Sequence, residues 1–157
     1  MQGHVASKSE LEAVARVCIE HDLIAVSDEV YEHCLFPGHA HQQLASVVPG
    51  MRERTITLGS GGKLFSLTGW RVAWAVGPAE LLRPVGAAHT HLTFSAPTPL
   101  QAGIAAALDL EDGLEAIGPL FSENFDLLAG ALRDGTNVRL SISSVHPIGS
   151  MWLVAGM

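Results

Sequence analysis

Three short apolar runs, each followed by polar or glycine residues, alternate with stretches of helical periodicity along this 157-residue chain. The first run, residues 23–27, predicts a buried parallel strand, and residues 54–58 and 71–76 predict two more strands rich in residues that favour sheets. Residues 9–20 precede the first run and predict an amphipathic helix. Strands that alternate with helices favour an α/β fold, which is the fold class predicted here.

Prolines mark the helices expected in the middle of the chain. Residues 79–88 predict a helix that is interrupted near Pro84, because proline removes a backbone donor and crowds the preceding turn. Residues 100–110 predict another helix. Pro97 or Pro99 suits its first turn, where no backbone donor is needed.

Composition and charge exclude several classes of protein. Hydrophobic residues make up 48% of the chain and charged residues 16%, which excludes an intrinsically disordered protein. The net charge is −7, and no basic cluster is present to bind nucleic acid. Residues 85–108 carry no charge, but their prolines and histidines do not predict a membrane span. Two cysteines without secretory features predict a reducing compartment.

A glycine-rich segment, Gly-Ser-Gly-Gly-Lys at residues 59–63, follows the second predicted strand and could hold a phosphate. It does not match the nucleotide P-loop, because Thr57 stands where that motif needs glycine and Leu64 stands where it needs serine or threonine. A dinucleotide fingerprint would need glycine in place of Leu64. Taken alone, the segment predicts a tight turn better than a phosphate site.

Histidines and cysteines give weaker candidates for chemistry. Two His-x-His pairs occur at residues 39–41 and 89–91, but neither has a third ligand at helical spacing, so we predict no metal site. Cys18 lies on the inward face of the first predicted helix and Cys34 lies in a predicted loop. Neither position is typical of a reactive thiol.

Five polar residues lie around the predicted strand ends: Asp28, Tyr31, Ser60, Lys63 and Arg71. In the segments 27–33 (Ser-Asp-Glu-Val-Tyr-Glu-His) and 60–71 (Ser-Gly-Gly-Lys-Leu-Phe-Ser-Leu-Thr-Gly-Trp-Arg), this set resembles the pyridoxal 5′-phosphate (PLP) site of the class I and II aminotransferases, fold type I. Residues 27–108 are similar to the kynurenine–oxoglutarate transaminase and cysteine-S-conjugate β-lyase branch of that family.

The resemblance implies a role for each of these residues. Lys63 is expected to form a Schiff base with the aldehyde of PLP and to move a proton between substrate and cofactor, since a deprotonated amine can do both. Asp28 is expected to keep the pyridine nitrogen protonated, so that the ring withdraws electrons. Tyr31 is expected to bond the phenolic oxygen, and Ser60 and Arg71 are expected to bind the phosphate.

Each role has a structural alternative that the sequence leaves open. Asp28 could cap a helix that follows the strand, and Tyr31 could be a buried aromatic residue with a satisfied hydroxyl. Lys63 and Arg71 could be ordinary surface cations. By resemblance, Phe94 lines the substrate pocket of a neighbouring subunit, although a place in the core suits an aromatic residue equally well.

The resemblance also implies the domain organisation. Residues 1–118 are expected to form the C-terminal portion of the PLP-binding large domain, in the aspartate-aminotransferase-like fold. Residues 119–157 are expected to begin the small C-terminal α+β domain, which agrees with a change of composition near residues 112–119. The family's N-terminal part and the arginine that binds the substrate carboxylate are expected to lie outside this sequence.

Two functions of different kinds follow from the resemblance. The first is a PLP-dependent transaminase that moves an amino group from an aromatic or sulfur-containing, kynurenine-like amino acid to a 2-oxo acid, with a homodimer as its expected form. The alternative is a truncated, non-catalytic protein that binds PLP and pairs with a longer relative, or a cysteine-S-conjugate β-lyase. We expect a cytoplasmic location, or a mitochondrial or plastid one if a targeting segment precedes Met1.

Overall fold

The computed structural model of this chain describes residues 4–110 and 113–135, with side chains up to residue 132. The described residues fall into two compact units. The first, here called the sheet unit, consists of Ala6–Val30 and Gln42–Glu111. The second, here called the α5 unit, is drawn from Met1–Val5, Tyr31–His41 and Asp112–Met157.

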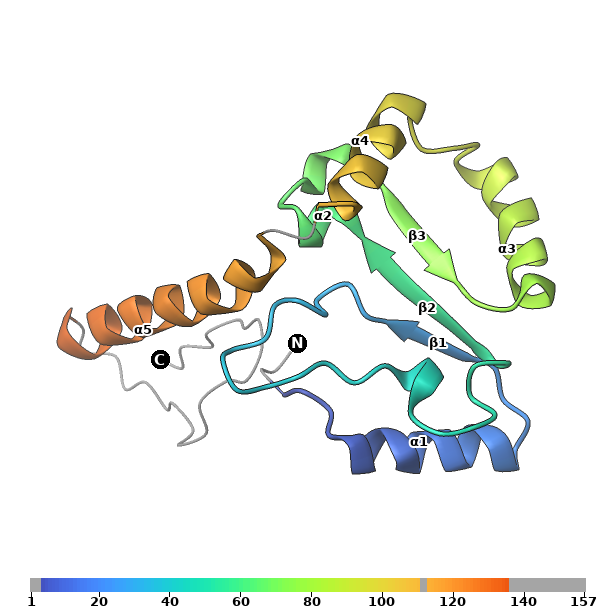
Figure 1. Cartoon of the computed structure of the whole chain (residues 1–157), viewed down its shortest axis with the longest axis horizontal. Helices are drawn as coiled ribbons and strands as arrows, with labels where there is room; N and C mark the ends of the chain where they lie inside the picture. The colour runs from blue at the N-terminus through green and yellow to red at the C-terminus, as the bar shows by residue number, and fades with distance from the viewer. Residues whose placement is uncertain (1–3, 111–112, 136–157) are drawn as a thin grey trace. The chain divides into compact units, whose positions relative to one another are not determined.

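A three-stranded sheet forms the centre of the sheet unit, and its strands are β1 (Ala25–Asp28), β2 (Thr55–Ser60) and β3 (Ala73–Val76). The strand order is β1-β2-β3 (Figure 1), with β1 parallel to β2 and β3 antiparallel to it. All three predicted strands are therefore confirmed, with slightly different bounds. Together with the helices between them they confirm the α/β fold class.

The first helix, α1 (Lys8–Glu20), begins with a capping box. The Ser7 hydroxyl oxygen accepts the Glu10 amide at 3.3 Å, and the Ser7 amide donates to the Glu10 carboxylate at 2.7 Å. These bonds satisfy backbone groups that a helix start leaves without partners. The inward face of α1 joins a core formed with the 3₁₀ turn η1 (Leu44–Ser46). The buried core residues are Ala15, Cys18, Ala25, Leu44 and Met51.

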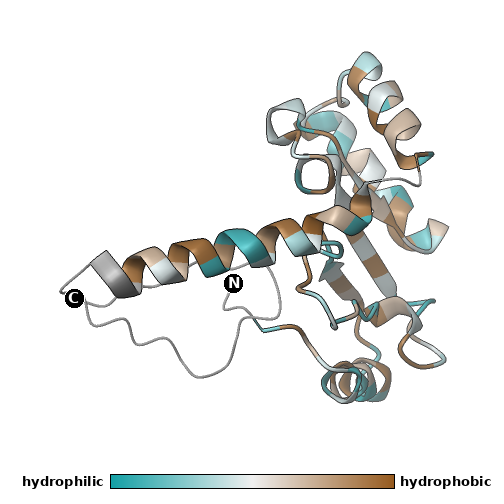
Figure 2. Ribbon diagram, turned by 60° about the vertical axis from the view of Figure 1, so that its left-hand side comes forward, coloured by the Kyte–Doolittle hydropathy of each residue, from teal (hydrophilic) through white to brown (hydrophobic). Residues whose placement is uncertain are grey.

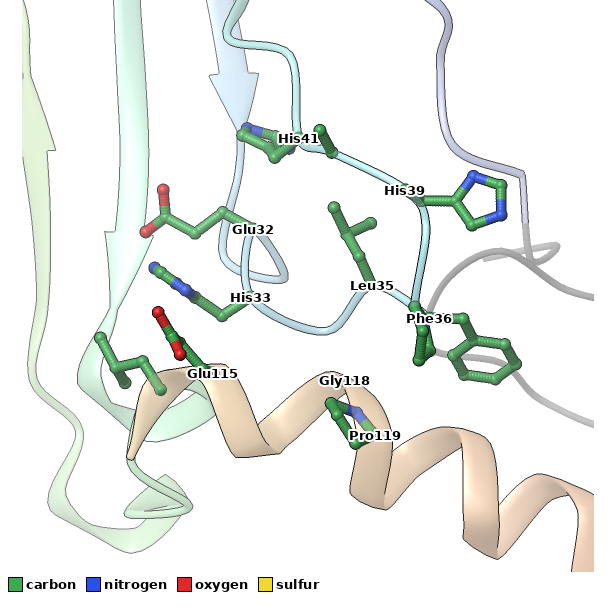
Figure 3. Close-up of a pocket in the computed structure, with 12 residues that line it drawn as sticks. Glu32, His33, Leu35, Phe36, His39, His41, Glu115, Gly118 and Pro119 are labelled. Carbon is green, nitrogen blue, oxygen red and sulfur yellow. The ribbon is translucent and has the colours of Figure 1, made fainter. Parts of the chain in front are cut away.

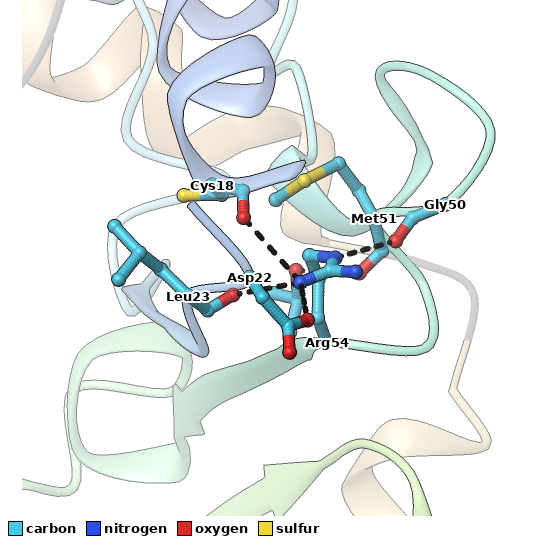
Figure 4. A network of polar contacts seen from close by, with 7 residues as sticks. Cys18, Asp22, Leu23, Gly50, Met51 and Arg54 are labelled. Atoms are coloured by element: carbon cyan, nitrogen blue, oxygen red, sulfur yellow. Dashed lines mark hydrogen bonds and ion pairs between the residues drawn. The ribbon is translucent and has the colours of Figure 1, made fainter. Parts of the chain in front are cut away.

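Arg54 connects the end of α1 to the start of β2 (Figure 4). Its Nη1 donates to the carbonyls of Cys18 at 3.4 Å and Leu23 at 3.2 Å, and its Nε donates to the Gly50 carbonyl at 3.1 Å. The same Nη1 lies 3.0 Å from the carboxylate of Asp22. Cys18 lies in the last turn of α1, and its carbonyl also accepts the Leu23 amide at 2.8 Å. The guanidinium therefore joins the end of α1 to the residues just before β2.

The expectation of a buried first strand is wrong for most of its side chains. Ala25 is buried, but Ile24 and Val26 are 60% and 64% exposed. Successive side chains of a strand point to opposite faces. The core residues packed on Ala25 cover one face of β1, and no described residue covers the face of Val26 to the same extent.

The helix α3 (Ala79–Leu92) runs through Pro84 without the predicted interruption. Proline cannot donate to the carbonyl four residues earlier, but no residue of α3 is buried, so water can bond the exposed carbonyl. The next helix, α4 (Thr98–Leu108), confirms the prediction for this region. Pro97 occupies the capping position, and Pro99 lies in the first turn.

The α5 unit contains the 3₁₀ turn η3 (Leu114–Ala116) and the helix α5 (Ile117–Gly135). Hydrophobic and hydrophilic residues alternate along α5 (Figure 2), as expected for an amphipathic helix. Within this unit the rings of Phe36 and Phe125 pack with centroids 5.9 Å apart. The predicted domain boundary after residue 118 falls in the first turn of α5 and stays a prediction, and residues 136–157 lie outside the described part.

Candidate functional site

The parallel pairing of β1 and β2 brings two of the predicted residues to one edge of the sheet. Asp28 is the last residue of β1 and pairs with Leu58, and β2 continues two residues further to Ser60. Neighbouring strands lie about 4.8 Å apart. Asp28 and Ser60 therefore lie at the carboxyl ends of adjacent parallel strands, where open α/β sheets bind their ligands.

Lys63 lies within a one-turn helix, α2 (Gly61–Leu64), that follows β2 directly. The Ser60 hydroxyl oxygen accepts the Gly62 amide at 3.2 Å and so caps this turn. Leu64 is buried, whereas Lys63 is exposed. The turn thus buries its apolar residue and leaves Lys63 exposed.

Close packing explains the glycines around Lys63. A Cβ atom on Gly59 would collide with the indole of Trp74, and one on Gly61 would collide with the Ile104 side chain of α4. Neither glycine has a positive φ angle. The segment therefore needs glycine because side chains pack against its backbone.

Arg71 stands at the end of the 3₁₀ turn η2 (Thr68–Trp70), two residues before β3. Its backbone is left-handed, with φ 56° and ψ 36°, a conformation that costs on the order of 1 kcal/mol for a residue other than glycine. Its Nη1 donates to the Thr68 carbonyl at 3.1 Å. The next residue, Val72, accepts the Gly61 amide at 3.2 Å, which holds Arg71 beside the start of α2.

Asp28 does not cap a helix, because residues 30–33 form a turn and no helix begins there. Its Oδ1 instead accepts the Val30 amide at 3.3 Å within that turn. The helix-cap alternative is therefore wrong. Tyr31 lies in the same turn, is half-buried and belongs to the α5 unit, where its carbonyl accepts the Cys34 amide at 2.9 Å.

Phe94 follows α3 and is 78% exposed, with φ 66°. The alternative that it is a core residue is wrong, because most of its ring is open to solvent. Its predicted role in the pocket of a neighbouring subunit stays a prediction.

Four predicted residues of the sheet unit thus gather around the carboxyl end of β2: Asp28, Ser60, Lys63 and Arg71. Their functional groups are a carboxylate, a hydroxyl, an amine and a guanidinium. This donor set fits PLP, whose ring nitrogen, aldehyde and phosphate need these kinds of partner. Across residues 4–110 and 113–135, no three His, Cys, Asp or Glu side chains are arranged to hold a metal ion.

The sequence prediction missed Glu29, which follows Asp28 and is only 6% exposed. Its Oε1 accepts hydrogen bonds from the Ser27 hydroxyl and from the Leu44 amide. The available signal was its spacing, because Ser27 and Glu29 are two apart in a strand and so lie on the same side.

The α5 unit holds a cavity of about 360 Å³ that none of the predicted site residues lines. Glu32 and His33 line it together with Glu115 from η3, and their polar groups lie near one another (Figure 3). Leu35 and Phe36 form an apolar part of its wall. No helix within the described ranges has the length and hydropathy that crossing a bilayer requires.

Comparison with known proteins identifies relatives of this chain. The family model for aminotransferase class I and II matches residues 1–147. The Dictyostelium discoideum kynurenine–oxoglutarate transaminase is 40% identical over 97% of this chain and 35% of its own length. The mouse kynurenine–oxoglutarate transaminase 3 is 45% identical over 67% of this chain and 23% of its own length.

Solved structures give the same result for the fold. N-Succinyldiaminopimelate aminotransferase from Mycobacterium tuberculosis superposes with a TM-score of 0.86 and 38% identity, over 98% of this chain and 39% of that one. Aspartate aminotransferase from Thermus thermophilus superposes with a TM-score of 0.80 and 33% identity, over 94% and 37%. The predicted aspartate-aminotransferase-like fold is confirmed, although the chain spans only about a quarter to two fifths of these relatives. On the family match and this likeness, the chain belongs to the class I and II aminotransferases.

Proposed function

We propose that this chain forms part of a PLP-dependent transaminase. The observation that carries the proposal is the gathering of Asp28, Ser60, Lys63 and Arg71 around the carboxyl end of β2. The proposed reaction moves an amino group from an aromatic or sulfur-containing amino acid to a 2-oxo acid. The relatives named kynurenine–oxoglutarate transaminase support this choice of substrate class.

PLP supplies an electron sink that makes the α-proton of a bound amino acid removable. In the proposed site, the amine of Lys63 would hold the cofactor at its aldehyde carbon and would take the proton from the substrate α-carbon. Asp28 keeps a proton on the ring nitrogen. The fork of Arg71 and the hydroxyl of Ser60 bind the phosphate, and the phenol of Tyr31 bonds the phenolic oxygen.

We further propose that the working form is a homodimer and that it resides in the cytoplasm. The exposed ring of Phe94 supports the first point, because it is available to a second subunit. Cys18 and Cys34 are buried thiols, which is typical of a reducing compartment.

Two lysines in the sequence, Lys8 and Lys63, allow a direct test. The chain is mixed with PLP, the imine is reduced with borohydride, and the modified lysine is identified by peptide mass spectrometry. We expect modification and a visible absorbance band in the wild type and in Lys8→Ala, and neither in Lys63→Ala. Lys8 is a matched control, because it is exposed on α1 and lies 3.9 Å from the Glu12 carboxylate.

The amino-acid substrate is then added to the PLP-loaded chain. Loss of the visible band with formation of the 2-oxo acid supports the transaminase. A band that persists without product supports the non-catalytic alternative, and pyruvate or ammonia from a cysteine S-conjugate indicates β-lyase activity. Equal labelling of Lys63→Ala and wild type contradicts the proposal.

A further inference from the structure

Glu29 is a buried carboxylate that the proposed chemistry does not use. Glutamate is seldom buried unless it is paired, because removing its charge from water is costly without hydrogen bonds. Its side chain receives 2.8 Å and 3.3 Å bonds from the Ser27 hydroxyl and the Leu44 amide, both at Oε1. Bonds to an ionised acceptor are about twice as strong as bonds between neutral groups.

Hydrogen bonds hold the residues on both sides of Asp28 in the sequence. Ser27 precedes Asp28, and its hydroxyl is held by Glu29 from the other side. The Glu29 amide donates to the Leu58 carbonyl at 3.0 Å, so the β1–β2 ladder extends one residue beyond Asp28. Ser27 and Glu29, the two neighbours of Asp28, are therefore both held by hydrogen bonds.

The Leu44 bond adds a third segment to this anchor. Leu44 opens η1 and is buried in the core beneath β1. By accepting its amide, Glu29 ties the end of β1 to the point where the chain re-enters the sheet unit at Gln42. Asp28 itself is exposed at the end of a four-residue strand, where an unanchored backbone would let its carboxylate move.

We propose that Glu29 is a positioning residue that holds the carboxylate of Asp28 where the ring nitrogen of PLP binds. This inference rests on the proposed function. Ser27 and Glu29 point to one side of the strand and Asp28 to the other, so Glu29 acts on the cofactor through the backbone of Asp28 and not by contact.

A double-mutant cycle tests this proposal. The dissociation constant of PLP is measured from visible absorbance for wild type, Glu29→Gln, Asp28→Asn and the double variant. Glutamine keeps the shape but lacks the charge, so we expect Glu29→Gln to weaken PLP binding about tenfold. In the Asp28→Asn background we expect less than about a twofold further effect, since the effects of residues coupled through a shared backbone shift are not additive.

The controls separate positioning from general stability. Glu53→Gln changes an exposed carboxylate outside the site and is expected to bind PLP as the wild type does. Thermal unfolding of each PLP-free variant is recorded in parallel. If Glu29→Gln does not fold, Ser27→Ala removes one donor to Glu29 and takes its place in the cycle.

The outcomes distinguish this inference from the proposed function. Additive effects of Glu29→Gln and Asp28→Asn, or unchanged PLP binding by Glu29→Gln, overturn the positioning role while Lys63 labelling stands. A wild-type chain that does not attach PLP at Lys63 overturns both. Non-additive loss of binding supports the positioning role.

Discussion

Close packing determines which side chains the backbone near Lys63 tolerates. The indole of Trp74 lies against Gly59 so closely that a β-carbon has no room. The three nearest atoms all belong to the indole of Trp74, the strand partner of Gly59, so relief requires this packed side chain to move. The strand that leads into the proposed site therefore requires glycine at position 59, because any larger side chain would collide with Trp74.

Gly59→Ala is expected to lower the free energy of unfolding by about 1–3 kcal/mol, the usual cost of overpacking. Urea denaturation followed by circular dichroism measures this change. Gly86→Ala is the matched control, because Gly86 lies in α3 with no atom within 4 Å of the added carbon. It is expected to stabilise the chain by about 0.5–1 kcal/mol. Equal effects of the two substitutions would contradict the packing argument.

Arg71 allows a second prediction at the residue scale. A guanidinium that binds phosphate distinguishes PLP from pyridoxal, which has the same ring without the phosphate. Arg71→Ala is expected to reduce the preference for PLP by about tenfold or more, because bonds to charged groups contribute about 1.5–3 kcal/mol. Competition between the two ligands measures the preference. Arg52→Ala, an exposed cation before β2, is expected to leave it unchanged.

Among the secondary-structure elements, α1 is held by specific polar groups at both ends. At its start, Ser7 and Glu10 form a capping box. At the other end Arg54 binds main-chain carbonyls, which no sequence pattern revealed. Polar anchors of this kind depend on distances between segments, so they could not be predicted from spacing alone.

Arg54→Met is expected to lower the free energy of unfolding by about 1–3 kcal/mol, since it removes the charged donor to the carbonyls of Cys18, Leu23 and Gly50. Asp22→Asn is the comparison. The Asp22 side chain is 94% exposed, and exposed ion pairs contribute about 0–1 kcal/mol. Asparagine also tolerates the left-handed backbone of this residue, φ 49°. Thermal unfolding that shows a larger loss in Asp22→Asn would contradict this assignment.

How far the sequence predicted the molecule differs from element to element. Runs of apolar and β-branched residues located the three strands, periodicity located α1, and prolines helped to locate the start of α4. These signals did not show that β3 is antiparallel to β2, that α3 tolerates Pro84, or that Glu29 is buried. The residues near β2 were found through a motif, whereas the left-handed backbone of Arg71 and the packing on Gly59 arise from contacts that only the folded chain contains.

For the whole molecule, the three-stranded sheet exposes apolar side chains at both of its outer strands. Val26 of β1 and Val76 of β3 are 64% and 62% exposed, and each of these strands has one neighbour among the described strands. Exposed edges with apolar residues pair readily with other chains. The sequence and structure therefore predict association of this chain at high concentration.

Val26→Lys is expected to reduce that association, because lysine on an edge strand opposes pairing with another edge. Light scattering across a concentration series measures it, and thermal unfolding serves as the check that the chain still folds. Thr90→Lys, which changes an exposed residue of α3, adds the same charge away from the sheet. Equal suppression by both variants would show that net charge, and not the strand edge, controls association.

The bond between the Glu29 carboxylate and the Leu44 amide joins the two places where the chain leaves the sheet unit and comes back. The excursion of residues 31–41 is thereby closed at its base. Doubling the length of a closed loop costs only about 0.6 kcal/mol of entropy. Changes in the length or sequence of most of residues 31–41 are therefore expected to leave β1 intact. We expect relatives of this chain to differ in this segment.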